Sequence, residues 1–149
     1  MKIARTGSSN DNNFHRYSTI HITNDTRATG NVVNISDSTP PYRFWRFIPL
    51  KKATHGNIAE IFFYDSAGNR LNGNVIGTAG SFENRATRTR EAAFDGNTLT
   101  YFESPDDNIP WVGIDFDQPV KISRLLYYPR SDGNSVEPND MYELFCWQN

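Results

Sequence analysis

Cysteine, histidine and long apolar runs are scarce in this chain of 149 residues. The single cysteine, Cys146, excludes an internal disulfide framework and a cysteine-rich metal site. The three histidines are scattered, so no pairing of a nucleophile with a base is visible. No apolar run approaches the length of a membrane span, and the N-terminus has no apolar signal segment. The sequence therefore predicts no membrane insertion, no disulfide framework and no nucleophilic active site.

An excess of positive charge is also missing. The formal net charge is -2, which gives no reason to expect a nucleic acid or an anionic membrane as a partner. Residues 1–60 carry eight Lys and Arg against four Asp and Glu, whereas the remainder carries seven against thirteen. The acidic part of the chain is the part that holds a candidate metal-binding turn.

Aromatic residues are plentiful, in contrast, with ten Phe, seven Tyr and three Trp. These large side chains can fill a thin sandwich with few residues, although the hydrophobic fraction is only 37%. The length fits a single domain, which we place at residues 14–149. Residues 1–13 are polar and rich in Ser and Asn, so we interpret them as a disordered leader or an expression remnant.

Short runs of β-forming residues follow one another with turn signals between them. Gly73 to Arg90 is predicted to be a loop, Gln118-Pro119 a corner, and Thr87 to Phe94 the one short helix. This pattern predicts an all-β antiparallel sandwich or jelly roll. The expected strands lie at residues 17–22, 31–35, 42–48, 58–64, 112–116, 120–128 and 141–147.

The turn that begins at Asp95 is rich in oxygen-bearing side chains. Gly96 can adopt the positive φ of a tight corner, while Asp95, the Asn97 carbonyl and the Thr100 hydroxyl are oxygen donors of the kind that calcium prefers. Asp-Gly is equally a common turn signal. From the turn alone, a metal corner and a purely structural corner both remain open.

Glu60 is a second anomaly, because it interrupts the apolar run from Ile58 to Tyr64. A buried carboxylate is costly unless it is paired or binds a metal. The alternative is an edge strand on which Glu60 points to solvent.

Two groups of fragments resemble the coagulation factor 5/8 type C, or discoidin-like, domain. Residues 93–102, 111–116 and 122–130 look like the front half of that domain, and residues 42–48 and 57–64 look like its back half. The resemblance implies an antiparallel jelly-roll β-sandwich. The two halves stand in reversed order, which implies either a circularly permuted domain or a chain that spans the boundary between two modules. Modules of this kind that are similar to carbohydrate-binding module family 32 are often attached to larger secreted bacterial enzymes.

The resemblance also implies a structural calcium ion and a location. The Ca²⁺ ligands would be the carboxylates of Asp95 and Glu60, Thr100, and the carbonyls of Ala92 and Asn97. We therefore expect a rigidifying role for the metal rather than a catalytic one. A secreted, cell-surface or periplasmic location, as part of a larger protein with further domains, follows from the same resemblance.

The expected function is binding of a glycan or glycoconjugate rather than catalysis. Planar polar groups that take sugar hydroxyls occur together in Arg130, Asp132 and Asn134, on one loop. His55 and Phe102 lie on two other loops and are weaker candidates. Alternatively, Arg130 forms an ordinary surface ion pair with Asp132.

Two other functions compete with glycan binding. Adhesion to a protein or cell surface would require a broad apolar patch at the loop tips, and the loop after Arg130 is polar. A glycosidase would require two carboxylates at a defined separation, and the pairs Asp106-Asp107 and Asp115/Asp117 have the pattern of solvated faces. We therefore expect a non-catalytic module.

Overall fold

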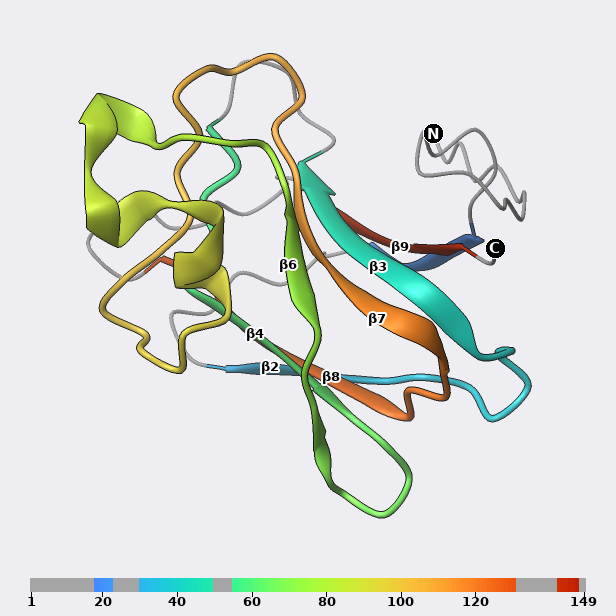
Figure 1. Ribbon diagram of the computed structural model, residues 1–149. Helices are drawn as coiled ribbons and strands as arrows, with labels where there is room; N and C mark the ends of the chain where they lie inside the picture. The colour runs from blue at the N-terminus through green and yellow to red at the C-terminus, as the bar shows by residue number, and fades with distance from the viewer. Residues whose placement is uncertain (1–17, 23–29, 50–54, 131–141, 148–149) are drawn as a thin grey trace.

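The computed structural model describes residues 18–22, 30–49, 55–130 and 142–147, which form an antiparallel β-sandwich (Figure 1). The described strands are β1 (Ser18–Ile22), β2 (Asn31–Asn34), β3 (Tyr42–Pro49), β4 (Glu60–Tyr64), β5 (Arg70–Leu71), β6 (Asn74–Gly77), β7 (Val112–Val120), β8 (Arg124–Tyr128) and β9 (Tyr142–Trp147). Three 3-10 turns, η1 (Phe82–Asn84), η2 (Ala86–Arg88) and η3 (Arg90–Ala93), lie between β6 and β7. In this part of the chain no helix has the length and hydropathy that crossing a membrane requires.

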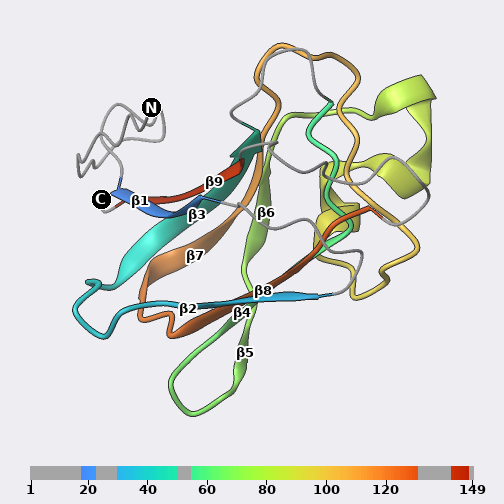
Figure 2. The same ribbon diagram turned by 180° about the vertical axis from the view of Figure 1, so that it is seen from behind.

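The strands form two sheets that face each other (Figures 1 and 2). The first sheet has the order β1-β9-β3-β7-β6 and the second has the order β2-β8-β4-β5. The prediction of an all-β antiparallel sandwich is confirmed. β1 pairs with β9, so the first and last described strands are neighbours. Nearby chain ends are what a permuted domain needs, and the permutation itself stays a prediction.

Aromatic side chains from both sheets fill the space between them. Trp45 of β3 is fully buried, and its ring centroid lies 5.8 Å from that of Phe63 on β4. Phe63 in turn meets Phe116 of β7 edge to face at 5.6 Å. Burial of each such ring contributes about 1.5–3 kcal/mol. A few large side chains therefore join the layers, as the aromatic content predicts.

The prediction of a loop from Gly73 to Arg90 is wrong at its start, where β6 forms. A Cβ atom added to Gly73 or to Gly77 would collide with backbone atoms of β7 or of the residue before it. These glycines thus permit close approach of two strands, a role that sequence cannot distinguish from that of a loop glycine.

The predicted corner at Gln118-Pro119 falls within β7, which continues to Val120, at an irregular stretch: Asp117 has a φ of 64°, and none of the described residues between Asp115 and Val120 pairs with β3. β6 pairs with β7 only up to Asp115, so Pro119 lies where β7 has lost this neighbour. The missing N–H of Pro119 therefore costs no hydrogen bond on that side. The short helix predicted from Thr87 to Phe94 forms the turns η2 and η3 instead.

Candidate functional site

The turn that begins at Asp95 is closed by hydrogen bonds to both oxygens of the Asp95 carboxylate. The Asn97 N–H donates to Asp95 Oδ1 at 2.8 Å, and the Thr100 hydroxyl donates to Asp95 Oδ2 at 2.7 Å. The Thr100 N–H donates to the Asn97 carbonyl at 3.1 Å. Gly96 has a φ of 82°, a conformation that glycine adopts without strain. These interactions shape a rigid corner with oxygen atoms on its inner side.

Glu60 lies against this corner rather than in solvent. β4 runs between β8 and β5, so it is not an edge strand, and Glu60 is 0% exposed. The Gly96 N–H donates to Glu60 Oε2 at 2.6 Å, whereas Oε1 is buried without a hydrogen-bond partner. The alternative of an edge-strand Glu60 is therefore wrong, and one buried acceptor is left unsatisfied, which is costly.

The environment of Glu60 favours its protonated form. Burial raises the pKa of Glu60 to about 7, and the hydrogen bond from Gly96 counteracts part of this increase. The negative charge of Asp95 raises the same pKa further. A cation between the two carboxylates would relieve both the desolvation and the repulsion.

Four of the five predicted metal ligands are brought together at this corner. Asp95, Asn97 and Thr100 are joined by hydrogen bonds, and Glu60 is attached through Gly96. Ala92 is buried in η3, and the role of its carbonyl as a ligand stays a prediction. Whether a metal binds here stays a prediction.

The described residues contain no group of three or more His, Cys, Asp or Glu that could hold a metal ion. A cation at this corner would therefore depend on two carboxylates together with neutral carbonyl and hydroxyl oxygens. This is the type of donor set that Ca²⁺ accepts. The residues present fit calcium and do not fit a transition metal that needs nitrogen or sulfur ligands.

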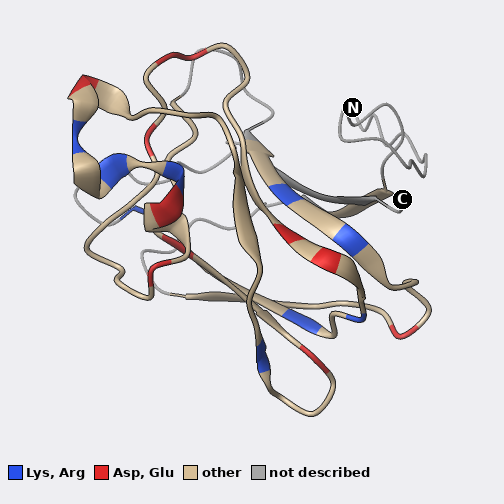
Figure 3. Ribbon diagram, in the orientation of Figure 1, with Lys and Arg blue, Asp and Glu red and all other residues tan. Residues whose placement is uncertain are grey.

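A second polar cluster is centred on the buried carboxylate of Glu103. Arg88 Nη1 donates to Glu103 Oε2 at 2.6 Å, and Arg130 Nη1 donates to Oε1 at 2.9 Å. The three side chains are between 7% and 15% exposed. The neighbouring 3-10 turns carry both signs of charge, with Arg85, Arg88 and Arg90 between Glu83 and Glu91 (Figure 3). The carboxylate thus links η2 to the end of β8.

Tyr101 provides an aromatic surface beside this cluster. The guanidinium carbon of Arg130 lies 4.0 Å from the centre of the Tyr101 ring, and that of Arg88 lies 5.3 Å from it. Arg130 also donates to the Asn57 side-chain oxygen at 3.3 Å. Tyr101 remains partly exposed. The arrangement combines planar polar groups with an aromatic ring, which is the chemistry that sugar recognition uses.

The predicted ligand-binding residues differ in burial and in whether they lie within the described part of the chain. Arg130 is 8% exposed and is held by Glu103, so it is not an ordinary surface ion-pair residue. Phe102 is fully buried in the core, so its selection as a ligand contact is wrong. Asp132 and Asn134 lie outside the described residues, and their role stays a prediction.

His55 occupies a structural position near the same end of the sandwich. Its Nδ1 lies 2.8 Å from the Ser104 carbonyl and donates to it, and its ring packs against Phe82 at 4.9 Å. The Ser104 N–H returns a hydrogen bond to the His55 carbonyl. These contacts connect two loops and fix the ring. His55 therefore lies near the predicted binding loops, and its role as a ligand contact stays a prediction.

Sequence reasoning missed Arg88 and Glu103 as members of the cluster. The two residues stand fifteen positions apart in irregular segments, where no periodic pattern predicts proximity. The sequence contains one weak indication that Glu103 is buried. Glu103 directly follows the aromatic pair Tyr101-Phe102, and a carboxylate beside apolar residues is a candidate for burial.

Fold and clusters together define a β-sandwich with a polar loop region and an acidic corner. The comparison with protein families is consistent with this architecture. The model of the F5/8 type C domain matches residues 77–147, which include the Asp95 corner, the Glu103 cluster and the strands β7 to β9. Domains of this family are often carbohydrate- or ligand-binding modules. No curated protein and no solved structure matches the chain significantly.

Proposed function

We propose that this protein is a non-catalytic carbohydrate-binding module that recognises a glycan through the loops near Arg130 and carries a structural calcium ion at the Asp95 corner. The family match to residues 77–147 is the observation that carries this proposal. The module would act within a larger exported protein, to which it would supply attachment to a glycan. Similarity to carbohydrate-binding module family 32 is part of the proposal.

The loop cluster supports recognition of sugar hydroxyls. The guanidinium of Arg130 is held in place by Glu103 and by the Tyr101 ring, so little side-chain freedom is lost when a ligand binds. The partly exposed ring of Tyr101 offers a surface for the C–H face of a sugar. Asp132 and Asn134 follow Arg130 directly in the chain and would complete the set of planar polar groups.

The binding proposal is tested by a glycan array followed by calorimetric titration with the best neutral glycan found. Asn134→Ala and Tyr101→Ala should each weaken binding about tenfold, because each removes one contact to the sugar. Asn72→Ala is the matched control, since Asn72 is exposed and lines the cavity beside Phe94 rather than the Glu103 cluster. Equal affinity of all variants, or release of product from a chromogenic glycoside of the same sugar, would refute the proposal.

The calcium part of the proposal is supported by Glu60 Oε1, the buried oxygen that lacks a hydrogen-bond partner. Glu60, Asp95, Asn97 and Thr100 would hold the ion, and the ion would rigidify the corner by neutralising the two carboxylates. The bound metal would stabilise the folded state by about 2.7 kcal/mol at a free concentration of one hundred times its Kd.

Thermal melting with added calcium and with a chelator tests this. The wild type should melt at a higher temperature with calcium, and Glu60→Gln should lose this difference. Asp107→Asn, which removes an exposed carboxylate elsewhere, should keep it. An identical melting temperature of the wild type in calcium and in chelator would show that no structural metal binds.

Adhesion to a protein surface is the second candidate function. Leu99 is 84% exposed and Ile109 is 58% exposed, and both lie in connections between strands. Exposed apolar residues on loops are typical of protein or membrane contacts. If Leu99→Ser and Ile109→Ser abolish attachment to cells while glycan affinity is unchanged, adhesion replaces glycan recognition as the function.

A further inference from the structure

The outer face of the second sheet, β2-β8-β4-β5, is rich in partly exposed aromatic and apolar side chains. On β4 and β8 the inward residues are buried in the core, so their neighbours in sequence point outward. Val32 of β2 lies on the same face and is 59% exposed. The outward set on the two central strands comprises Phe62, Tyr64, Leu126 and Tyr128. This face lies on the side of the sheet away from the core, and at Tyr128 it ends two residues before Arg130 of the Glu103 cluster.

The strand register places one polar residue from each strand of this sheet in a single row. Tyr64 of β4 pairs with Arg70 of β5 on one side and with Arg124 of β8 on the other. Arg124 in turn pairs with Asn34 of β2. Adjacent strands are separated by about 4.8 Å, so two guanidinium groups, a phenol and an amide originate from one narrow band across the sheet.

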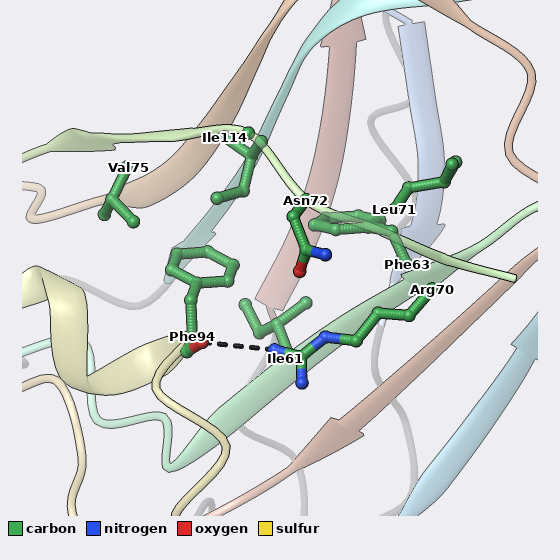
Figure 4. A pocket seen from close by; sticks show the side chains of 9 residues that line it. Ile61, Phe63, Arg70, Leu71, Asn72, Val75, Phe94 and Ile114 are labelled. Atoms are coloured by element: carbon green, nitrogen blue, oxygen red, sulfur yellow. Dashed lines mark hydrogen bonds between the residues drawn. The ribbon is translucent and has the colours of Figure 1, made fainter.

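The two arginines of this row stack on aromatic rings rather than pairing with acids. The guanidinium carbon of Arg124 lies 4.5 Å from the centre of the Tyr64 ring, and that of Arg70 lies 4.4 Å from the Phe62 ring. Arg70 also donates to the Phe94 carbonyl at 3.2 Å, at the edge of a cavity of about 90 Å³ between the sheets (Figure 4). Stacking holds each guanidinium flat, and Arg70 uses one of its N–H groups for the Phe94 carbonyl while the others remain for a ligand.

No carboxylate of the described residues forms a direct ion pair with this row, although the charge of Arg70 acts on the Glu60 carboxylate and lowers its pKa. Within the described residues, neither Arg70 nor Arg124 has a carboxylate within ion-pair distance, and both are exposed. Asp65, at the end of β4, uses its oxygens for the N–H groups of Ala67 and Asn69 and for the Asn69 amide. Basic residues accordingly mark β5 and β8 in the lower sheet (Figure 3).

We propose that this sheet face is a second binding surface, and that it takes an acidic glycan, one with uronate or sulfated sugars. Arg70 and Arg124 would accept the anionic groups through paired N–H donors, as guanidinium groups do with carboxylates and sulfates. The neighbouring row of Phe62, Leu126 and Val32 would contact the C–H faces of the sugars. The surface extends the proposed carbohydrate binding beyond the loops, and it does not depend on the loop site.

The charge and shape of the surface favour a glycan over other polyanions. A nucleic acid requires a broad basic surface, whereas this chain has a net charge of -2 and this row holds two cations. An anionic membrane is contacted by basic clusters or by apolar residues that protrude, whereas this face is a sheet surface with its arginines stacked flat. A linear acidic sugar chain can lie along such a face.

The test is calorimetric titration of the full chain with a hexasaccharide of alternating glucuronate and N-acetylglucosamine, at low ionic strength. Arg124→Gln and Arg70→Gln should each reduce affinity about tenfold, since each removes one charge-assisted contact. Arg85→Gln should leave affinity unchanged, because Arg85 is exposed on the distant 3-10 turns and pairs with Glu83. Arg124→Lys should lie between Arg124→Gln and the wild type, because it keeps the charge without the planar donor edge.

Three results would overturn the proposal. They are the absence of binding to the hexasaccharide, equal affinity for its carboxyl-reduced neutral form, and binding of phosphatidylserine vesicles without binding of the hexasaccharide. Failure of the loop site is a separate result, because that site is tested with neutral glycans and with Asn134→Ala. A change caused by Asn134→Ala alone, with Arg124→Gln at wild-type affinity, would also overturn the sheet-face proposal.

Discussion

The buried side chain of Glu60 carries a clear electrostatic cost, because burial raises its pKa to about 7. It stands in the middle of a hydrophobic strand, fully shielded from water, with one oxygen bonded to Gly96 and the other unpaired. Such a position is retained only where a gain offsets the desolvation of the carboxylate. The pKa of Glu60 therefore depends on the structure of the Asp95 corner, and titration of this one residue measures the state of that corner.

We predict a pH-dependent effect of Glu60→Gln in the presence of a chelator. The pKa of Glu60 is about 7 in the folded state and near 4.5 when unperturbed, so the folded state binds the proton more tightly. The stability of the wild type should consequently fall as pH rises from 4.5 to 7, by up to about 3 kcal/mol, whereas Glu60→Gln should lack this decline. Urea denaturation at pH 5 and pH 8 measures it; parallel pH profiles of the two proteins would contradict it.

At the scale of the element, the register between β3 and β7 shifts, and an ion pair spans that point. The pairing shifts between Tyr42 and Phe44, so Arg43 lies at the irregularity. Arg43 binds both oxygens of Asp115, with Nε to Oδ1 at 2.7 Å and Nη2 to Oδ2 at 2.9 Å. This two-point contact ties the irregular part of β3 to β7.

We predict that Asp115 contributes to stability above acidic pH and that Asp115→Asn abolishes this contribution. The hydrogen bonds from Arg43 lower the pKa of Asp115 in the folded state. Because the folded pKa is depressed, the stabilisation is present above the unfolded pKa of about 3.9 and is lost as pH falls below it. The loss should be at most about 1 kcal/mol, since the pair is partly exposed. Urea denaturation from pH 5 to pH 2.5 measures it, and a mutant with the same acid sensitivity as the wild type would exclude it.

At the scale of the whole molecule, the long excursion between β6 and β7 is attached to the sandwich through the Glu103 carboxylate. Glu103 joins Arg88 of η2 to Arg130 at the end of β8, and its backbone bonds to Arg88 and Phe82. Segments far apart in sequence thus share one mostly buried charge cluster. Removing the Glu103 charge would break its ion pairs with Arg130 and Arg88, and would leave Arg88 with the more distant, half-exposed Glu83 at 3.9 Å.

We predict that Glu103→Gln destabilises the protein by roughly 3 kcal/mol, which is typical for breaking a buried ion pair from one side. Glu91→Gln is the matched control, because Glu91 is more than half exposed and pairs with Arg90, which is not part of the Glu103 cluster. It should change the free energy of unfolding by less than about 0.5 kcal/mol. Denaturant titration of both variants provides the comparison, and similar losses in the two would show that the Glu103 cluster has no special structural role.

The sequence alone determined the class of fold, most strand positions and the chemistry of the acidic corner. Alternating apolar residues and turn signals act locally, so they predict β3, β4 and β9 closely and place Asp95, Asn97 and Thr100 within one turn. Only the tertiary structure decided that Glu60 is buried in a central strand, that Phe102 belongs to the core, and that Glu103 bridges two arginines. These outcomes depend on which strands become neighbours across the sandwich, and long-range pairing leaves no periodic signal in the chain.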